Sequence, residues 1–178
     1  MTSTKNPLLK AIDIATASMA ILRHVHEVDP MEPMAAQEEF CGSSLLRAQM
    51  SIEPMLLALS MELALKAWIV YDGTKKDAPY AHDLWKLFSN TSAATQERLK
   101  KRYEMEIAPV HPNIFFSDYG LEHVLKNARN AFVQWRYSYE LDRARFDHGL
   151  FTETVEMILS EFESRIVVEK QPPPFSHL

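Results

Sequence analysis

The feature that most constrains the fold of this chain is a run of apolar residues from Met55 to Tyr71. The run is nearly as long as a membrane span, which needs about 20 apolar residues. Glu62 and Lys66 lie inside it, and their spacing places them on one helical face in the order that favours an ion pair. Buried charges of this kind need protein partners, which a core helix can supply. We therefore predict a buried central helix, Ile52 to Tyr71, and no membrane span.

Apolar residues recur at helical spacing along most of the chain. Asn6 and Pro7 suit the N-cap and the first position of the first helix. Between this helix and the central one, residues 37–40 and 45–50 are expected to form short helical segments, separated by a break at Cys41–Ser44. The predicted helices are Pro7–Val28, Ile52–Tyr71, Ala81–Phe88, Ala93–Glu106, Leu121–Leu141 and Phe151–Val168.

No segment alternates apolar and polar residues for long enough to indicate a β-strand. The expected fold is therefore all-α, an up-and-down helical bundle of five to seven helices. Residues 1–170 are expected to form a single domain. Residues 171–178 contain Pro172, Pro173 and Pro174 and are expected to form an extended or disordered tail.

Composition excludes several classes of protein. A single cysteine, Cys41, cannot form an internal disulfide or a zinc finger, so we expect a cytoplasmic protein. The net charge of −5 argues against a broadly basic nucleic-acid-binding coat. The sequence contains no Walker loop, no glycine-rich dinucleotide turn and no His-Glu-x-x-His helix, so we expect neither a cofactor nor a metal ion.

Three short patterns follow one another between Ser51 and Glu140, a span of about half the chain. The first is Ser-Met-Glu-Leu-Ala-Leu-Lys at residues 60–66. The second is His-Asp-Leu-Trp-Lys-Leu at residues 82–87. The third is Arg-Asn-Ala-Phe-Val-Gln-Trp-Arg-Tyr-Ser-Tyr-Glu at residues 129–140. Together they resemble the HEPN family, helical nucleic-acid-associated domains of prokaryotic defence and toxin systems.

The resemblance implies a homodimer, and the ribonuclease members of the family place a histidine five to seven positions after an arginine. A histidine can accept the proton of a 2′-hydroxyl, and an arginine can hold the phosphate. Arg129 and Asn130 begin this pattern, but the three permitted positions hold Gln134, Trp135 and Arg136. We therefore expect a domain that is not catalytic and binds RNA or an antitoxin-like protein partner in a defence or toxin–antitoxin setting.

The resemblance also suggests which side chains line the binding groove. These are Arg129, Asn130, Arg136 and Tyr137, with Glu62, Lys66 and His82 nearby. The scarcity of other polar groups in the central helix suggests in addition that Glu62 pairs with Arg129 or Arg136 across the bundle.

Two alternatives remain open. In the first, the protein is a metal-independent ribonuclease whose histidine is His82, His123 or His148. His148 lies five positions after Arg143, although Ala144 replaces the usual polar residue and Gly149 suggests a helix end. In the second, the protein is an interaction module without a nucleic-acid role, and its apolar surplus forms a protein interface. The residues of that surplus are Trp68, Trp85, Phe115 and Phe116.

Overall fold

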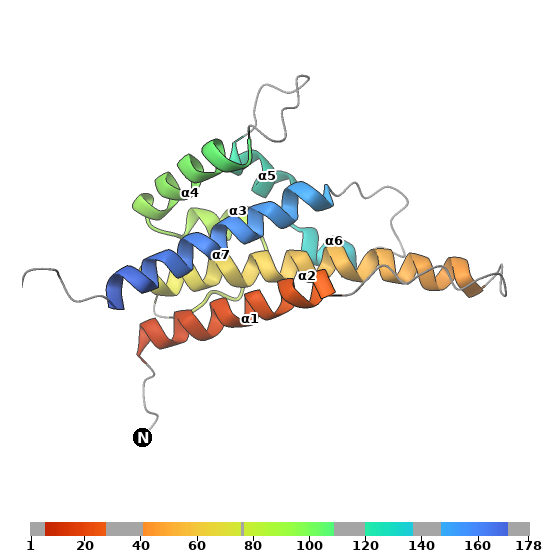
Figure 1. Ribbon diagram of the computed structural model, residues 1–178, viewed down its shortest axis with the longest axis horizontal. Helices are drawn as coiled ribbons and strands as arrows, with labels where there is room; N and C mark the ends of the chain where they lie inside the picture. The colour runs from red at the N-terminus through yellow and green to blue at the C-terminus, as the bar shows by residue number, and fades with distance from the viewer. Residues whose placement is uncertain (1–5, 28–40, 76, 109–119, 137–146, 171–178) are drawn as a thin grey trace, which may run out of the picture.

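The computed structural model describes the backbone of residues 6–27, 41–75, 77–108, 120–136 and 147–170. Side chains are described for residues 6–27, 52–75, 77–108, 120–134 and 147–167. These ranges contain helices and no strand, so the all-α helical bundle is confirmed (Figure 1). The helices are α1 (Pro7–Glu27), α2 (Cys41–Tyr71), α3 (Leu84–Ser89), α4 (Ala93–Glu106), α5 (Leu121–Asn127), α6 (Ala131–Arg136) and α7 (His148–Lys170).

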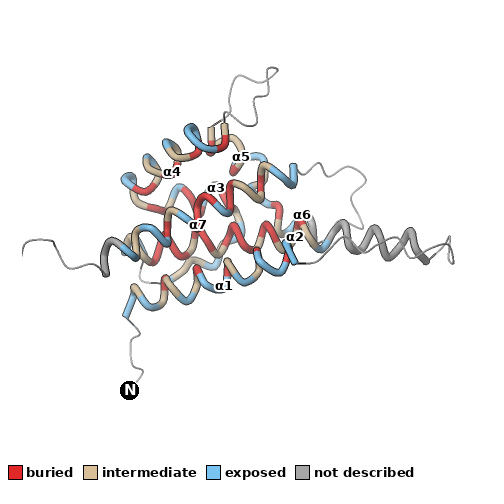
Figure 2. Tube along the Cα trace, viewed as in Figure 1, coloured by how far each residue is buried: buried red, intermediate tan, exposed pale blue. Residues whose placement is uncertain are grey.

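Helix α2 is the centre of the bundle and contacts α1, α3, α6 and α7. Its segment Ile52–Tyr71 is long and apolar enough to cross a membrane, but 67% of the apolar window is buried inside the protein. Figure 2 shows this concentration of buried residues along α2. The segment is therefore a core helix of the kind found in soluble proteins, as predicted.

The start of α2 differs from the prediction. We expected a break at Cys41–Ser44 and a helix beginning near Ile52, because Pro54 suits a first helical turn. The helix instead begins at Cys41 and continues through Pro54. Proline lacks the N–H that would bond to the carbonyl four residues earlier, so α2 lacks one bond of its ladder there.

Helix α1 lies against α2 through small residues. Its buried positions are Ala11, Ala15, Ser18, Leu22 and Val25. Helical spacing in the sequence predicts an apolar stripe of Leu8, Ile12, Ala15, Met19, Leu22 and Val25 or His26. Ala15, Leu22 and Val25 are buried as this spacing predicts, whereas Ala11 and Ser18 are buried in place of Ile12 and Met19. The Ser18 hydroxyl donates to the Ser60 carbonyl at 2.7 Å, and the Ser60 hydroxyl donates to the Ser18 carbonyl at 3.0 Å.

Three aromatic rings form the middle of the core. Trp68 of α2 meets Phe162 of α7 edge to face, with centroids 5.3 Å apart, and meets Tyr71 at 5.5 Å. The Trp68 indole N–H donates to the Ile158 carbonyl at 3.3 Å. Trp68 is fully buried, so its proposed place in a protein interface is wrong. Trp85 is only partly buried, and Phe115 and Phe116 lie outside the described residues.

The link between α2 and α4 shows that local caps were predictable. Gly73 ends α2 with a φ of +67°, and Ser92 caps α4 by accepting from the Thr95 N–H at 3.1 Å. Asp72 binds the same turn from the other side, accepting from the Ser92 N–H at 2.7 Å. Helix α4 therefore has the predicted bounds, Ala93–Glu106.

The predicted long helix from Leu121 to Leu141 is wrong, because a turn at residues 128–130 divides it into α5 and α6. In a continuous helix the Arg129 carbonyl would accept from the N–H four residues later. Here it accepts from the Leu84 N–H at 2.9 Å, at the start of α3. A tertiary hydrogen bond thus replaces a helical one, and Arg129 lies in a turn rather than on a helical face.

Candidate functional site

A carboxylate buried in α2 lies at the base of the candidate site. The Glu62 side chain is only 3% exposed, and Lys66 donates to its Oε1 at 2.6 Å. Its other oxygen, Oε2, lies 2.9 Å from His82 Nδ1. Burying a carboxylate is unfavourable unless cations and hydrogen-bond donors surround it. Glu62 satisfies this need with one group from its own helix and one from the segment before α3.

The imidazole of His82 is fixed on one side and open on the other. Because a carboxylate oxygen accepts hydrogen bonds, this contact favours the ring tautomer with the proton on Nδ1, which would leave Nε2 as the acceptor nitrogen. One face of the ring stacks on Phe132, with centroids 5.3 Å apart and an interplanar angle of 25°. The side chain nevertheless remains 53% exposed. The structure therefore orients His82 toward solvent.

Arg129 is held beside His82 by the next residue, Asp83. Its Nε donates to Asp83 Oδ2 at 3.1 Å and its Nη2 donates to the same oxygen, while the arginine side chain remains 55% exposed. The other oxygen, Oδ1, accepts from the Lys86 N–H at 3.0 Å and caps α3. Asp83 is thus the N-cap of α3.

The pKa of Asp83 reflects these contacts. Partial burial alone would raise the pKa, but the hydrogen bond from Arg129, the backbone N–H groups of Lys86 and Trp85 and the positive charge of Arg129 outweigh it. The pKa of Asp83 therefore lies below its usual value, and the carboxylate stays ionised as a partner for Arg129 at neutral pH. We call the following residues the His82 cluster: Glu62, Lys66, His82, Asp83, Arg129 and Phe132.

Two lysines, Lys126 of α5 and Lys100 of α4, pair with Glu122 at the start of α5. Lys126 lies over the Trp85 ring, 4.3 Å from its centroid, and donates to Glu122 at 3.2 Å. Hydrogen bonds from Lys100 and Lys126 lower the pKa of Glu122, although its partial burial opposes the shift. Residues 80–90 and 120–134 together carry a net charge of +1, whereas the whole chain carries −5. These two segments are thus less acidic than the chain as a whole.

The predicted ion pair between Glu62 and Arg129 does not form. Glu62 binds Lys66 and His82, and Arg129 binds Asp83, because the turn at residues 128–130 places Arg129 at the start of α3. The Arg136 side chain and Tyr137 lie outside the described residues, so the pairing of Glu62 with Arg136 does too.

The structure separates the three alternative histidines. His82 is linked to Arg129 through its neighbour Asp83, which binds the guanidinium. His123 lies on α5 and is partly buried. His148 begins α7, and its Nε2 lies 3.0 Å from Glu53 Oε1 of α2. Asn130 is exposed, and its carbonyl accepts from the Gln134 N–H to open α6.

Two members of the cluster differ from the main expectation from the sequence. The spacing of Phe132 with Trp135 and Tyr139 favoured a core position over a base-stacking surface, and the Phe132 ring is partly exposed and stacks on His82. Asp83 was expected mainly as a helix cap, with a place at the edge of a binding cleft as the alternative, and its second oxygen holds Arg129. The signal available in the sequence was that His82 and Asp83 are adjacent. A histidine can bind a carboxylate and an aspartate can bind a cation.

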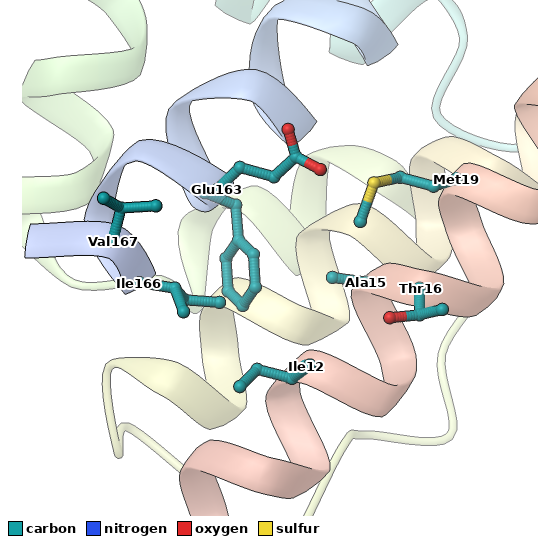
Figure 3. A pocket seen from close by; sticks show the side chains of 8 residues that line it. Ile12, Ala15, Thr16, Met19, Glu163, Ile166 and Val167 are labelled. Carbon is teal, nitrogen blue, oxygen red and sulfur yellow. The ribbon is translucent and has the colours of Figure 1, made fainter. Parts of the chain in front are cut away.

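A concave region apart from the His82 cluster lies between α1 and α7 (Figure 3). It encloses about 370 Å³, and Glu163 is its one ionisable side chain. The other lining residues are Ile12, Ala15, Thr16, Met19, Phe162, Ile166 and Val167. The groove thus offers no pair of groups for acid–base chemistry. Among the described residues, no group of three or more histidine, cysteine, aspartate or glutamate side chains could hold a metal ion.

Comparison of the chain with family models, with curated proteins and with solved structures gives no match.

Proposed function

We propose that the protein is a HEPN-like helical domain that binds RNA without cleaving it, through the surface formed by the His82 cluster. The observation that carries the proposal is the use of a buried carboxylate, Glu62, to hold an exposed imidazole beside an exposed guanidinium. Buried ion pairs contribute little net stability compared with apolar packing. An arrangement that places a charge in the core and orients His82 toward solvent therefore suggests a binding role.

The chemistry of the surface favours RNA over an acidic protein surface as the ligand. Arg129 retains donors that Asp83 does not use, and guanidinium groups bind phosphate with directed hydrogen bonds. The half-exposed His82 ring adds a flat surface and a hydrogen-bonding nitrogen. The net charge of +1 on these segments reduces the repulsion that a polyanion meets from a chain of net charge −5.

The proposal includes the setting that the family resemblance implies. The protein would act as a cytoplasmic homodimer in a defence or toxin–antitoxin system, with two copies of the cluster contributing to one groove. Each protomer of such a dimer would need only a small set of phosphate contacts.

The test is RNA binding by the full chain in EDTA, measured by fluorescence anisotropy at several salt concentrations. The expected result is salt-dependent binding without cleavage. Arg129→Ala should weaken binding and reduce the slope of log affinity against log salt by about 0.7, the value for one phosphate contact on a single strand. Arg23→Ala, which removes an exposed arginine of α1, should bind as the parent protein does. Absence of binding by the parent protein would overturn the proposal.

A specific observation favours ribonuclease activity as a second candidate function. The 2.9 Å contact of His82 Nδ1 with Glu62 Oε2 favours the tautomer with the proton on Nδ1, which would leave Nε2 as a base on the half-exposed ring. In that reaction Nε2 would accept the proton of a 2′-hydroxyl, and the 2′-oxygen would attack the adjacent phosphorus to form a 2′,3′-cyclic phosphate. The bond from phosphorus to the 5′-oxygen would break, and that oxygen would take a proton from water and leave as a hydroxyl group. Arg129 would stabilise the charge on the phosphate oxygens.

Cleavage of RNA in EDTA separates the two functions. The ribonuclease requires cleavage by the parent protein and its loss in both His82→Gln and Arg129→Ala. Binding without cleavage supports the first proposal. The protein-interaction alternative predicts neither binding nor cleavage of RNA.

A further inference from the structure

Tyr80 is the most exposed large hydrophobic side chain in the described part of the protein. Its relative exposure is 107%, so its ring is fully in water. It lies two residues before His82, in the segment that leads into α3. Isolated exposed hydrophobic residues are common, and exposure alone would assign no role to Tyr80.

The backbone around Tyr80 holds it outward. The Ala81 N–H donates to the Pro79 carbonyl at 2.9 Å, which closes a three-residue turn with Tyr80 at its apex. Pro79 fixes its own φ, which further restricts the turn. At the other end, His82 is bound to Glu62 and Asp83 to Arg129. The exposed ring therefore extends from a segment fixed on both sides rather than from a loose loop.

The position of Tyr80 relates it to the His82 cluster. Two residues along a chain span at most about 7 Å, so the Tyr80 and His82 backbones lie close together. A fully exposed aromatic ring, a half-exposed imidazole and an arginine in one short region are the elements with which proteins bind single strands: stacking surfaces for bases and a cation for the backbone.

We propose that Tyr80 is a base-stacking residue and that the ligand of the His82 cluster is single-stranded RNA with unpaired bases. This inference rests on the proposed RNA-binding function and names its substrate class. Paired bases in a duplex do not offer their faces to a side chain, so Tyr80 discriminates between the two forms of RNA. Because its hydroxyl is in water, the stacking role requires the ring and not the phenolic group.

The experiment measures the affinity of Tyr80→Ala and Tyr80→Phe for a single-stranded RNA and for the same sequence as a duplex. Removing a stacking ring lowers affinity by about fivefold to 150-fold per base. We expect that loss for Tyr80→Ala on the single strand only, with an unchanged salt slope because no charge is removed. Tyr80→Phe should bind as the parent protein does.

Two controls distinguish the failure of this inference from the failure of the proposed function. Leu9→Ala removes another exposed hydrophobic side chain, on α1, and should leave binding unchanged. If Tyr80→Ala binds single-stranded RNA normally while Arg129→Ala is weakened, the stacking role is wrong and RNA binding stands. Equal losses on single strand and duplex would also overturn the stacking role. If the parent protein binds no RNA, both proposals fail.

Discussion

Trp68 and Glu62 lie six residues apart on α2 and are both buried, yet they have opposite surroundings. Trp68 packs against two aromatic rings and bonds to a backbone carbonyl, so its surroundings serve stability. Glu62 is surrounded by charged and polar groups that lead out to solvent through His82. One helix thus carries a packing centre and an anchor for a surface site. The comparison shows that burial alone does not tell whether a residue packs the core or holds a side chain at the surface.

The largest effect on stability is expected at the packing centre. Trp68→Ala should lower the free energy of unfolding by about 3–5 kcal/mol, because it removes a large buried ring and leaves a cavity. Urea denaturation measures the change. Trp85→Ala is the matched control: Trp85 is only partly buried, so its loss should be clearly smaller. Equal losses of unfolding free energy in the two variants would contradict the role of Trp68 as the packing centre.

Substitution of Glu62 should lower stability through the loss of a charge rather than the loss of packing. Glu62→Gln leaves the Lys66 ammonium without its counter-charge in a largely buried position, which should cost about 3 kcal/mol. Adding Lys66→Met should recover most of that loss, since both charges are then gone. A double-mutant cycle measured by urea denaturation tests this. A double variant as unstable as Glu62→Gln alone would show that the pair is not the reason for the loss.

The smallest effect is expected at Asp83, and it depends on pH. Its folded-state pKa lies below its unfolded value of about 3.9, so the ionised form contributes stability above that pH. This contribution is lost as the pH falls through the lower folded pKa. Asp83→Asn, which can still cap α3, should cost about 1 kcal/mol at pH 7 and almost nothing near pH 2. A difference between the two proteins that persists at pH 2 would contradict the ion pair with Arg129.

The sequence predicted the features that depend on local chemistry. The Asn6 side chain accepts from the Leu8 N–H at 3.1 Å, and α1 begins at Pro7 as its cap and proline indicate. Helix α4 also has its predicted bounds, Ala93–Glu106. Residues Glu62, Lys66 and His82 were each selected as candidate site residues, and the structure brings them together.

The features that the sequence did not predict depend on contacts between distant segments. The division between α5 and α6 follows from a hydrogen bond between the Arg129 carbonyl and the Leu84 N–H, 45 positions apart. The partner of Glu62 depends on the same turn, because a continuous helix would have placed Arg129 elsewhere. Helical periodicity indicates which face is buried but not which residue of another segment lies opposite.

The central claim is that the His82 cluster is where RNA binds, and the nuclear magnetic resonance signals of the histidine rings test it most directly. Single-stranded RNA would be titrated into the labelled protein while the imidazole Cε1–Hε1 signals are followed, with assignment by His82→Gln. We predict that the His82 signal shifts, whereas the signal of His26, which pairs with Glu156 on α7, does not move. A His82 signal that stays in place while RNA binds would contradict the account.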